Sequence, residues 1–138
     1  MPPDPLVVQE TRAWLAKADE DLSASELCPH ARRSLPATAT YHAQQAAEKV
    51  IKAWLTWHGL TFRKTHHLIE IAEPSLALDP TLREPLQAAL VLSQYAWKHR
   101  YPGEWAAPSK AEATEALTLA QRLYRAILDR LPSDVAPG

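Results

Sequence analysis

Polar side chains recur at three- and four-residue spacing in the apolar segment 42–52. They belong to His42, Gln45, Glu48, Lys49 and Lys52. Residues at this spacing share one face of a helix, and a helix that packs into a small bundle rarely keeps a carboxylate and two lysines there without a use. Glu48 and Lys52 also stand in the acid-to-base order that a solvated helix face shows. We therefore interpret the stripe as a ligand or partner surface, with a solvated face as the alternative.

A second group of residues combines an arginine with aromatic rings. It consists of Tyr95, Trp97, Lys98, His99, Arg100, Tyr101 and Trp105. Arginine can bind phosphate bidentately while aromatic rings stack on a base, which is the chemistry of nucleotide or single-stranded RNA recognition. The alternative is a helix end whose arginine satisfies carbonyl groups while the tryptophans fill a bundle. The candidate ligand- or phosphate-binding residues are thus Gln45, Glu48, Lys49, Lys52, Tyr95, Arg100 and Tyr101.

Histidines supply candidates for proton transfer. His66 and His67 follow Thr65 and are either general acids or bases, or structural residues beside a threonine cap. The chain has six histidines, but only these two are close in sequence, and adjacent residues point in different directions on a helix. We therefore expect no metal site and no cofactor.

Length and composition predict one globular domain. We expect a single helical domain over residues 1–138, with an ordered core from about residue 8 to 131. The longest apolar run is far shorter than the ~20 residues that a membrane span needs. The N-terminal residues lack the basic and apolar parts of a signal peptide, so we expect a cytoplasmic protein. The single cysteine, Cys28, is predicted to be a small buried residue.

The net charge of −1 is unevenly distributed along the chain. Residues 42–67 hold four lysines and arginines against one carboxylate, a local charge of +3, and the rest of the chain is therefore at −4. This asymmetry is a mild indication of a phosphate-bearing or acidic partner, with a solvated basic face as the alternative.

Helical periodicity, prolines and glycines divide the chain into elements. We predict helices over about 8–27 and 36–58, the second closed by Gly59 in a left-handed cap. A short helix is predicted over 67–72 and limited by Pro74.

Two more helices complete the prediction. Asp79 and Pro80 open the first of them, and its inner side is expected to carry Leu82, Leu86, Ala89, Leu90, Ser93 and Trp97. The last helix begins with a capping box at Ser109 and extends to Leu131, and the residues after it are expected to fray. Alternating strand patterns are missing, so the predicted architecture is an all-α, up-and-down bundle of four main helices plus one short helix.

Four sequence motifs occur in order along the chain. They are Asp21-Leu22-x-Ala24, Tyr41-His42-Ala43-Gln44-Gln45-Ala46-Ala47-Glu48-Lys49-Val50-Ile51-Lys52-Ala53-Trp54-Leu55, Thr65-His66-His67-Leu68 and Arg100-Tyr101-Pro102. In order and spacing they resemble the HEPN family over nearly the whole chain. The resemblance implies a small helical domain that commonly forms two-fold dimers. It also implies a minimal nucleotidyltransferase encoded alongside, in many cases as a toxin–antitoxin pair, and many members are metal-independent ribonucleases.

The resemblance also implies where catalysis would reside. Catalytic members resemble one another in an arginine near a helix end and a histidine four to six intervening residues later. Arginine stabilises charge on the phosphate, and imidazole moves a proton. Arg100 stands at the arginine position, but the positions for the histidine hold Trp105, Ala106 and Ala107, and His99 precedes the arginine instead.

We therefore expect a homodimeric nucleotide- or RNA-binding member that is non-catalytic or weakly active and acts with a nucleotidyltransferase protein. The alternative is a metal-independent ribonuclease toxin in which Arg100 acts with a displaced histidine, His66 or His99.

Overall fold

The computed structural model describes residues 2–62, 64, 67–98, 102 and 106–137. These residues form the α-helices α1 (Pro5–Leu27), α2 (Pro36–Trp57), α3 (Leu68–Leu78), α4 (Arg83–Ala89) and α5 (Lys110–Leu128). Short 3₁₀ helices cover η1 (Cys28–His30), η2 (Pro80–Leu82), η3 (Leu90–Ala96) and η4 (Ser133–Val135). Strands do not occur in the described part of the chain, and the predicted all-α class is confirmed. None of the described helices is long and apolar enough to span a membrane.

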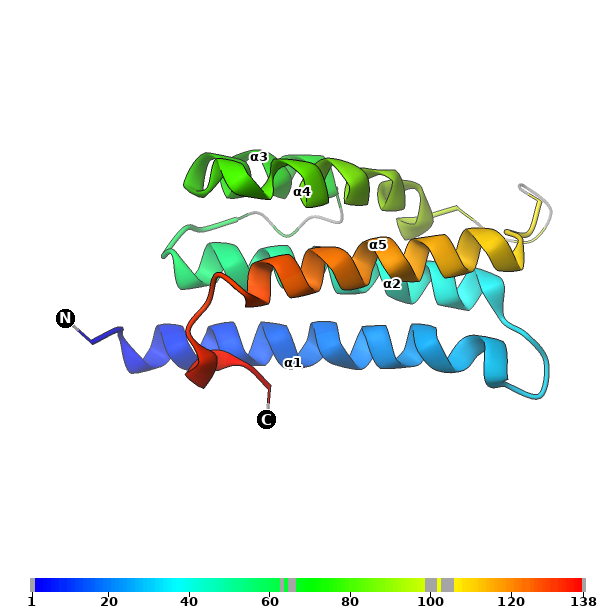
Figure 1. The fold of residues 1–138 in the computed structure, drawn as a ribbon, viewed down its shortest axis with the longest axis horizontal. Helices are drawn as coiled ribbons and strands as arrows, with labels where there is room; N and C mark the ends of the chain where they lie inside the picture. The colour runs from blue at the N-terminus through cyan, green and yellow to red at the C-terminus, as the bar shows by residue number, and fades with distance from the viewer. Residues whose placement is uncertain (1, 63, 65–66, 99–101, 103–105, 138) are drawn as a thin grey trace.

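Helix α2 is the central element of the bundle. It packs against α1, α5, α3 and η3. In Figure 1, α1 and α2 run antiparallel, α5 runs in the same direction as α2, and α3 and α4 lie on the side away from α1. From Ala43 to Leu55 every residue of α2 except Lys49 is buried. A helix enclosed all round usually carries apolar side chains, so the polar residues of α2 are exceptional.

The two ends of α2 follow the sequence prediction closely. Pro36 occupies the first turn, where a missing N–H costs nothing. Gly59 has a φ of 72°, the left-handed conformation that glycine adopts without strain. The amide of Leu60 donates to the carbonyl of Leu55 at 3.0 Å, and the amide of Gly59 donates to that of Thr56 at 3.0 Å. This is a Schellman cap, which satisfies carbonyl groups at the end of the helix.

Helix α3 is longer than predicted. We expected a helix over 67–72 limited by Pro74, but Pro74 lies inside α3. Leu68, Ile71 and Ser75 are buried on both sides of the proline. Proline removes one backbone hydrogen bond from a helix interior, and the packing of this apolar face offsets that loss.

The segment after α3 begins as predicted and then changes helix type. The side chain of Asp79 caps it by accepting a hydrogen bond from the amide of Thr81 at 2.9 Å. After α4 the chain continues as the 3₁₀ helix η3, whose side chains repeat every three residues. The buried positions there are Leu86, Ala89, Leu92 and Tyr95. The prediction of a continuous α-helix with Trp97 facing inward is wrong, and Trp97 is 52% exposed.

Helix α5 and the C-terminal segment close the bundle. Ser109 caps α5 by accepting from the amide of Glu112 at 3.0 Å, as predicted. The expectation of a frayed tail after Leu131 is wrong, because η4 packs on α1 and Val135 is fully buried. Arg12 of α1 donates to the carbonyl of Asp134 and holds this segment in place.

Candidate functional site

The polar stripe of α2 lies inside the bundle rather than on a solvated face. The exposed fractions are 8% for Gln45, 3% for Glu48 and 7% for Lys52. The solvated-face interpretation is therefore wrong for these residues. Lys49 is half-buried and lies at the accessible edge of the stripe, together with His42.

Asp21 of α1 organises that accessible edge. One carboxylate oxygen contacts Nδ1 of His42 at 2.8 Å, and the other accepts from Nζ of Lys49 at 2.5 Å. The Asp21 side chain is 10% exposed, whereas those of His42 and Lys49 are 30% and 23% exposed. A single buried carboxylate thus holds an imidazole and an ammonium group next to each other on α2. Asp21 is part of a sequence motif, but only the structure identifies it as the partner of both residues.

Lys52 occupies the buried end of the stripe. Its Nζ donates to the carboxylate of Glu48 at 3.3 Å. The same atom lies 5.4 Å from the centroid of the Trp14 ring and 5.7 Å from that of Phe62, within the range of cation–π attraction. The cost of burying the ammonium group is therefore offset by one carboxylate and two aromatic faces. Lys52→Glu would place a second carboxylate beside Glu48, so this substitution tests folding rather than binding.

A buried pair of glutamines lies beside the ion pairs. Nε2 of Gln45 donates to Oε1 of Gln44 at 2.7 Å. Gln44 is fully buried, and its own Nε2 has no hydrogen-bond acceptor among the residues that the structure describes. Sequence reasoning did not single out Gln44, because only its neighbour has the spacing of the stripe.

Tyr95 lies in the core and its ring is not open to a ligand. It is 5% exposed, and its hydroxyl donates to the carboxylate of Glu112 at 3.0 Å. Burial, together with Glu112, raises the pKa of Tyr95 to about 12. This ring was predicted to stack on a base, but in this structure the ring of Tyr95 has no accessible face.

The predicted catalytic residues lie outside the described residues. This holds for His66, His99, Arg100 and Tyr101, and also for Thr65 and Trp105. Their roles stay predictions. His67 is described and exposed just before α3. Within the described part of the chain, histidines, cysteines and carboxylates do not gather in groups of three that could hold a metal ion.

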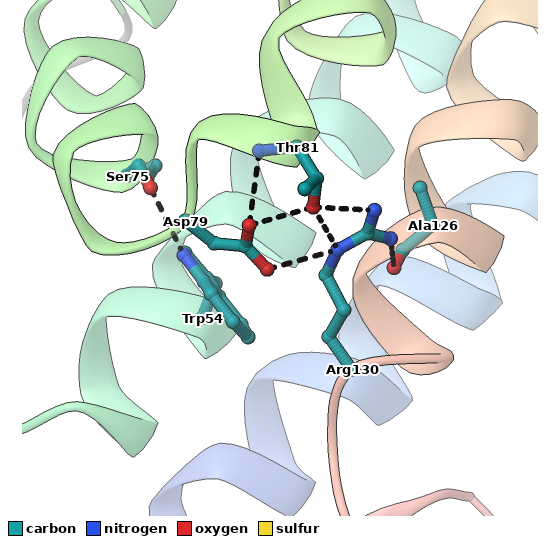
Figure 2. A network of polar contacts seen from close by, with 6 residues as sticks. All are labelled: Trp54, Ser75, Asp79, Thr81, Ala126 and Arg130. Atoms are coloured by element: carbon teal, nitrogen blue, oxygen red, sulfur yellow. Dashed lines mark hydrogen bonds and ion pairs between the residues drawn. The ribbon is translucent and has the colours of Figure 1, made fainter.

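A second polar network joins the start of η2 to the residues that follow α5 (Figure 2). Nε of Arg130 donates to Asp79 at 3.1 Å, and its Nη2 donates to Oγ1 of Thr81 at 2.9 Å. Its Nη1 donates to the carbonyl of Ala126. Hydrogen bonds from Thr81 lower the pKa of Asp79, and Arg130 adds to the effect. These contacts close helix ends, and we assign the network a structural role.

The comparison with known families follows this geometry. The HEPN domain model matches residues 11–131, which is most of the chain. A search of curated proteins and of solved structures gives no match. The matched segment includes most of α1 and all of α2 and α5, and therefore the whole stripe. The chain belongs to the HEPN domain family.

Proposed function

We propose that this HEPN domain binds RNA or a nucleotide through the accessible edge of the α2 stripe, with little or no catalytic activity. We further propose that it forms a homodimer in the cytoplasm and acts with a separate minimal nucleotidyltransferase protein in a toxin–antitoxin system. Family membership supports this proposal.

The observation that carries the binding proposal is the arrangement of His42 and Lys49 around Asp21. Both side chains keep part of their surface accessible, and Asp21 fixes both of them. Lysine provides a point charge for phosphate oxygen, and the second nitrogen of His42 is directed away from its contact with Asp21. Because the groups are already held in place, binding loses less side-chain entropy than it would with free lysines.

RNA binding can be tested by fluorescence anisotropy with a labelled single-stranded RNA over a series of salt concentrations. We expect affinity to fall as salt rises, because phosphate contacts release counterions. Lys49→Gln should weaken binding and reduce the salt slope by about one unit.

The matched control is Lys17→Gln, which removes the same charge from an exposed position on α1. Equal losses in the Lys17 and Lys49 variants, or binding that ignores salt, would contradict a site at the stripe. Thermal unfolding of both variants establishes that they are folded.

A second candidate function, a metal-independent ribonuclease, is favoured by one observation. Asp21 orients the imidazole of His42 in the way that carboxylates orient catalytic histidines. Arg100 would stabilise charge on the phosphate, with His42, His66 or His99 as the proton-transfer group.

The ribonuclease function is tested by incubating labelled RNA with the pure protein in EDTA. We expect the RNA to survive, because the positions after Arg100 lack a histidine. Robust cleavage that disappears in Arg100→Ala would establish the ribonuclease instead. His42→Asn, His66→Asn and His99→Asn would then identify the proton-transfer group.

Assembly is tested separately. Sedimentation at micromolar concentration should show a dimer, and a monomer alone would contradict the homodimer. Co-expression with a minimal nucleotidyltransferase encoded by a neighbouring gene, followed by size-exclusion chromatography, tests the partner.

A further inference from the structure

A pocket of about 550 Å³ lies at the end of the bundle where α1 turns into α2, and its lining on α1 begins at Ser25, about one helical turn after Asp21. Three segments line it: the end of α1 with η1, the first residues of α2, and the first turns of α5. Its volume is within the range of roughly 300–1,000 Å³ that small-molecule sites occupy.

The inner wall of this pocket is apolar or already hydrogen-bonded. Ala39, Ala113 and Leu117 contribute apolar surface. The hydroxyl of Ser25 donates to the carbonyl of Ala39 at 2.9 Å, and Sγ of Cys28 donates to the carbonyl of Ala24 at 3.2 Å. These polar atoms are satisfied within the chain, so the wall offers contact area rather than hydrogen bonds.

The exposed side of the pocket, its mouth, holds a lysine. Lys110 and His30 are exposed there, and Arg32 and Arg33 are exposed on the connection between α1 and α2 without lining the pocket. The structure gives no ion pair for Lys110, Arg32 or Arg33 with any described residue. The carboxylate that lines the pocket, that of Glu26, accepts a hydrogen bond from Gln121 at 2.8 Å.

Two helices begin at this mouth. The first residues of α2 and α5, Pro36 and Lys110, both line the pocket. Helix N-termini carry partial positive charge. The start of α2 has no side-chain cap among the described residues. These helix termini therefore add positive potential beside Lys110, whereas the carboxylate of Glu26 contributes a negative charge.

We propose that this pocket binds a small amphiphilic anion. The apolar body of the ligand occupies the cavity between α1, α2 and α5, and its single anionic group lies at the mouth beside Lys110 and His30. The apolar wall and Lys110, which forms no ion pair with the described residues, complement the two parts of such a molecule. This proposal is independent of RNA binding at the stripe.

Isothermal titration with octanoate and, separately, with 1-octanol tests the proposal on the full chain. The two probes share one apolar body and differ in charge. We expect octanoate to bind about tenfold more tightly, the effect of one charge-assisted contact. Equal affinities would overturn the proposed anion site.

Two substitutions test the contributions of the apolar wall and of the mouth separately. Lys110→Glu should remove the preference for octanoate and leave octanol binding unchanged. Glutamate in a first helical turn favours the helix, so loss of folding does not account for this result. Ala113→Phe fills the cavity and should weaken both probes. Lys17→Glu, on α1 outside the pocket, is the matched control and should change neither affinity.

A persisting preference for octanoate in Lys110→Glu, or unchanged affinities for both probes in folded Ala113→Phe, would overturn the proposal.

Sedimentation with vesicles of phosphatidylcholine and phosphatidylglycerol distinguishes a free anion from a membrane headgroup. We expect the chain to stay in the supernatant. Pelleting that Lys110→Glu abolishes would overturn the assignment to a free ligand.

Discussion

The polar stripe of α2 and the network around Arg130 differ in how far their charged side chains are buried. In the stripe, the side chains of Glu48 and Lys52 are only 3% and 8% exposed. In the network of Figure 2, the side chains of Asp79 and Arg130 are each 28% exposed. The stripe therefore removes its charges from water, whereas the Arg130 network keeps part of its charge solvated.

This difference shows which of the two regions needs an explanation beyond stability. A buried ion pair gains little over apolar residues of the same volume, because desolvation cancels most of its attraction. A partly exposed network that caps helix ends contributes modestly and directly to the fold. The buried pair of Glu48 and Lys52 therefore needs an explanation beyond stability, whereas the fold alone accounts for the Arg130 network.

The largest expected effect is that of Lys52→Met. Methionine retains an apolar stem against Trp14 and Phe62 but removes the ammonium group. The buried carboxylate of Glu48 then loses its ion pair with Lys52, and breaking a buried pair typically costs about 3–5 kcal/mol of unfolding free energy. Urea unfolding measures the loss.

The double variant Glu48→Gln with Lys52→Met is the control for that prediction. It removes both charges of the pair and should recover most of the lost stability, because the buried carboxylate is removed together with the ammonium group. If Lys52→Met lowers the unfolding free energy by less than about 1 kcal/mol, loss of the ion pair costs no more than an ordinary substitution. The contrast with the Arg130 network then fails.

Arg130→Ala should have a smaller effect. It removes hydrogen bonds to Asp79, Thr81 and the carbonyl of Ala126. Because the side chain is partly solvated, we expect a loss of about 1–2 kcal/mol in urea unfolding. Arg125→Ala, an exposed arginine on α5, is the control and should stay within about 0.5 kcal/mol of the unaltered protein. Equal losses of unfolding free energy in the two variants would show that the hydrogen bonds drawn in Figure 2 add nothing to stability beyond an ordinary exposed arginine.

Much of the fold was predictable because its signals are local. The apolar periods of α1, α2 and α5, the cap at Ser109 and the glycine after α2 all lie within a few residues of what they determine. The misses occurred where tertiary packing overrides a local rule. Pro74 stays helical because its flanks are buried, and the three-residue period of η3 places Trp97 in solvent.

The site was less predictable for a related physical reason. Spacing identified the residues of the stripe, but burial depends on which helices cover a face, and Lys52 was expected to be exposed. Asp21 lies 28 residues from Lys49, and Asp79 lies 51 residues from Arg130. Such pairings leave no local pattern in one sequence. The candidate residues His66, His99, Arg100 and Tyr101 lie outside the described residues and stay predictions.

The smallest expected effect concerns the pH dependence of the Arg130 network. Hydrogen bonds from Thr81, and then Arg130, hold the pKa of Asp79 below its usual value of 3.8. A carboxyl group with a lowered pKa in the folded state stabilises the protein above its unfolded pKa, and this contribution is lost as pH falls through the folded pKa. The advantage of the unaltered protein over Asp79→Asn should therefore be constant above about pH 5 and shrink below about pH 4.

Thr81→Val sharpens that prediction, because it removes the hydroxyl that donates to Asp79 at 2.6 Å while keeping the backbone amide. Carbon-13 NMR titration of the Asp79 carboxyl should then show a pKa closer to 3.8 than in the unaltered protein. Arg130→Ala should raise the same pKa by less, since the side-chain hydrogen bond from Thr81 is the largest single cause of the lowered pKa. If Arg130→Ala raises this pKa more than Thr81→Val does, the ion pair with Arg130 rather than the Thr81 hydroxyl controls the pKa of Asp79. In that case an ion pair would dominate the Arg130 network, as ion pairs do in the stripe, although the network is partly solvated.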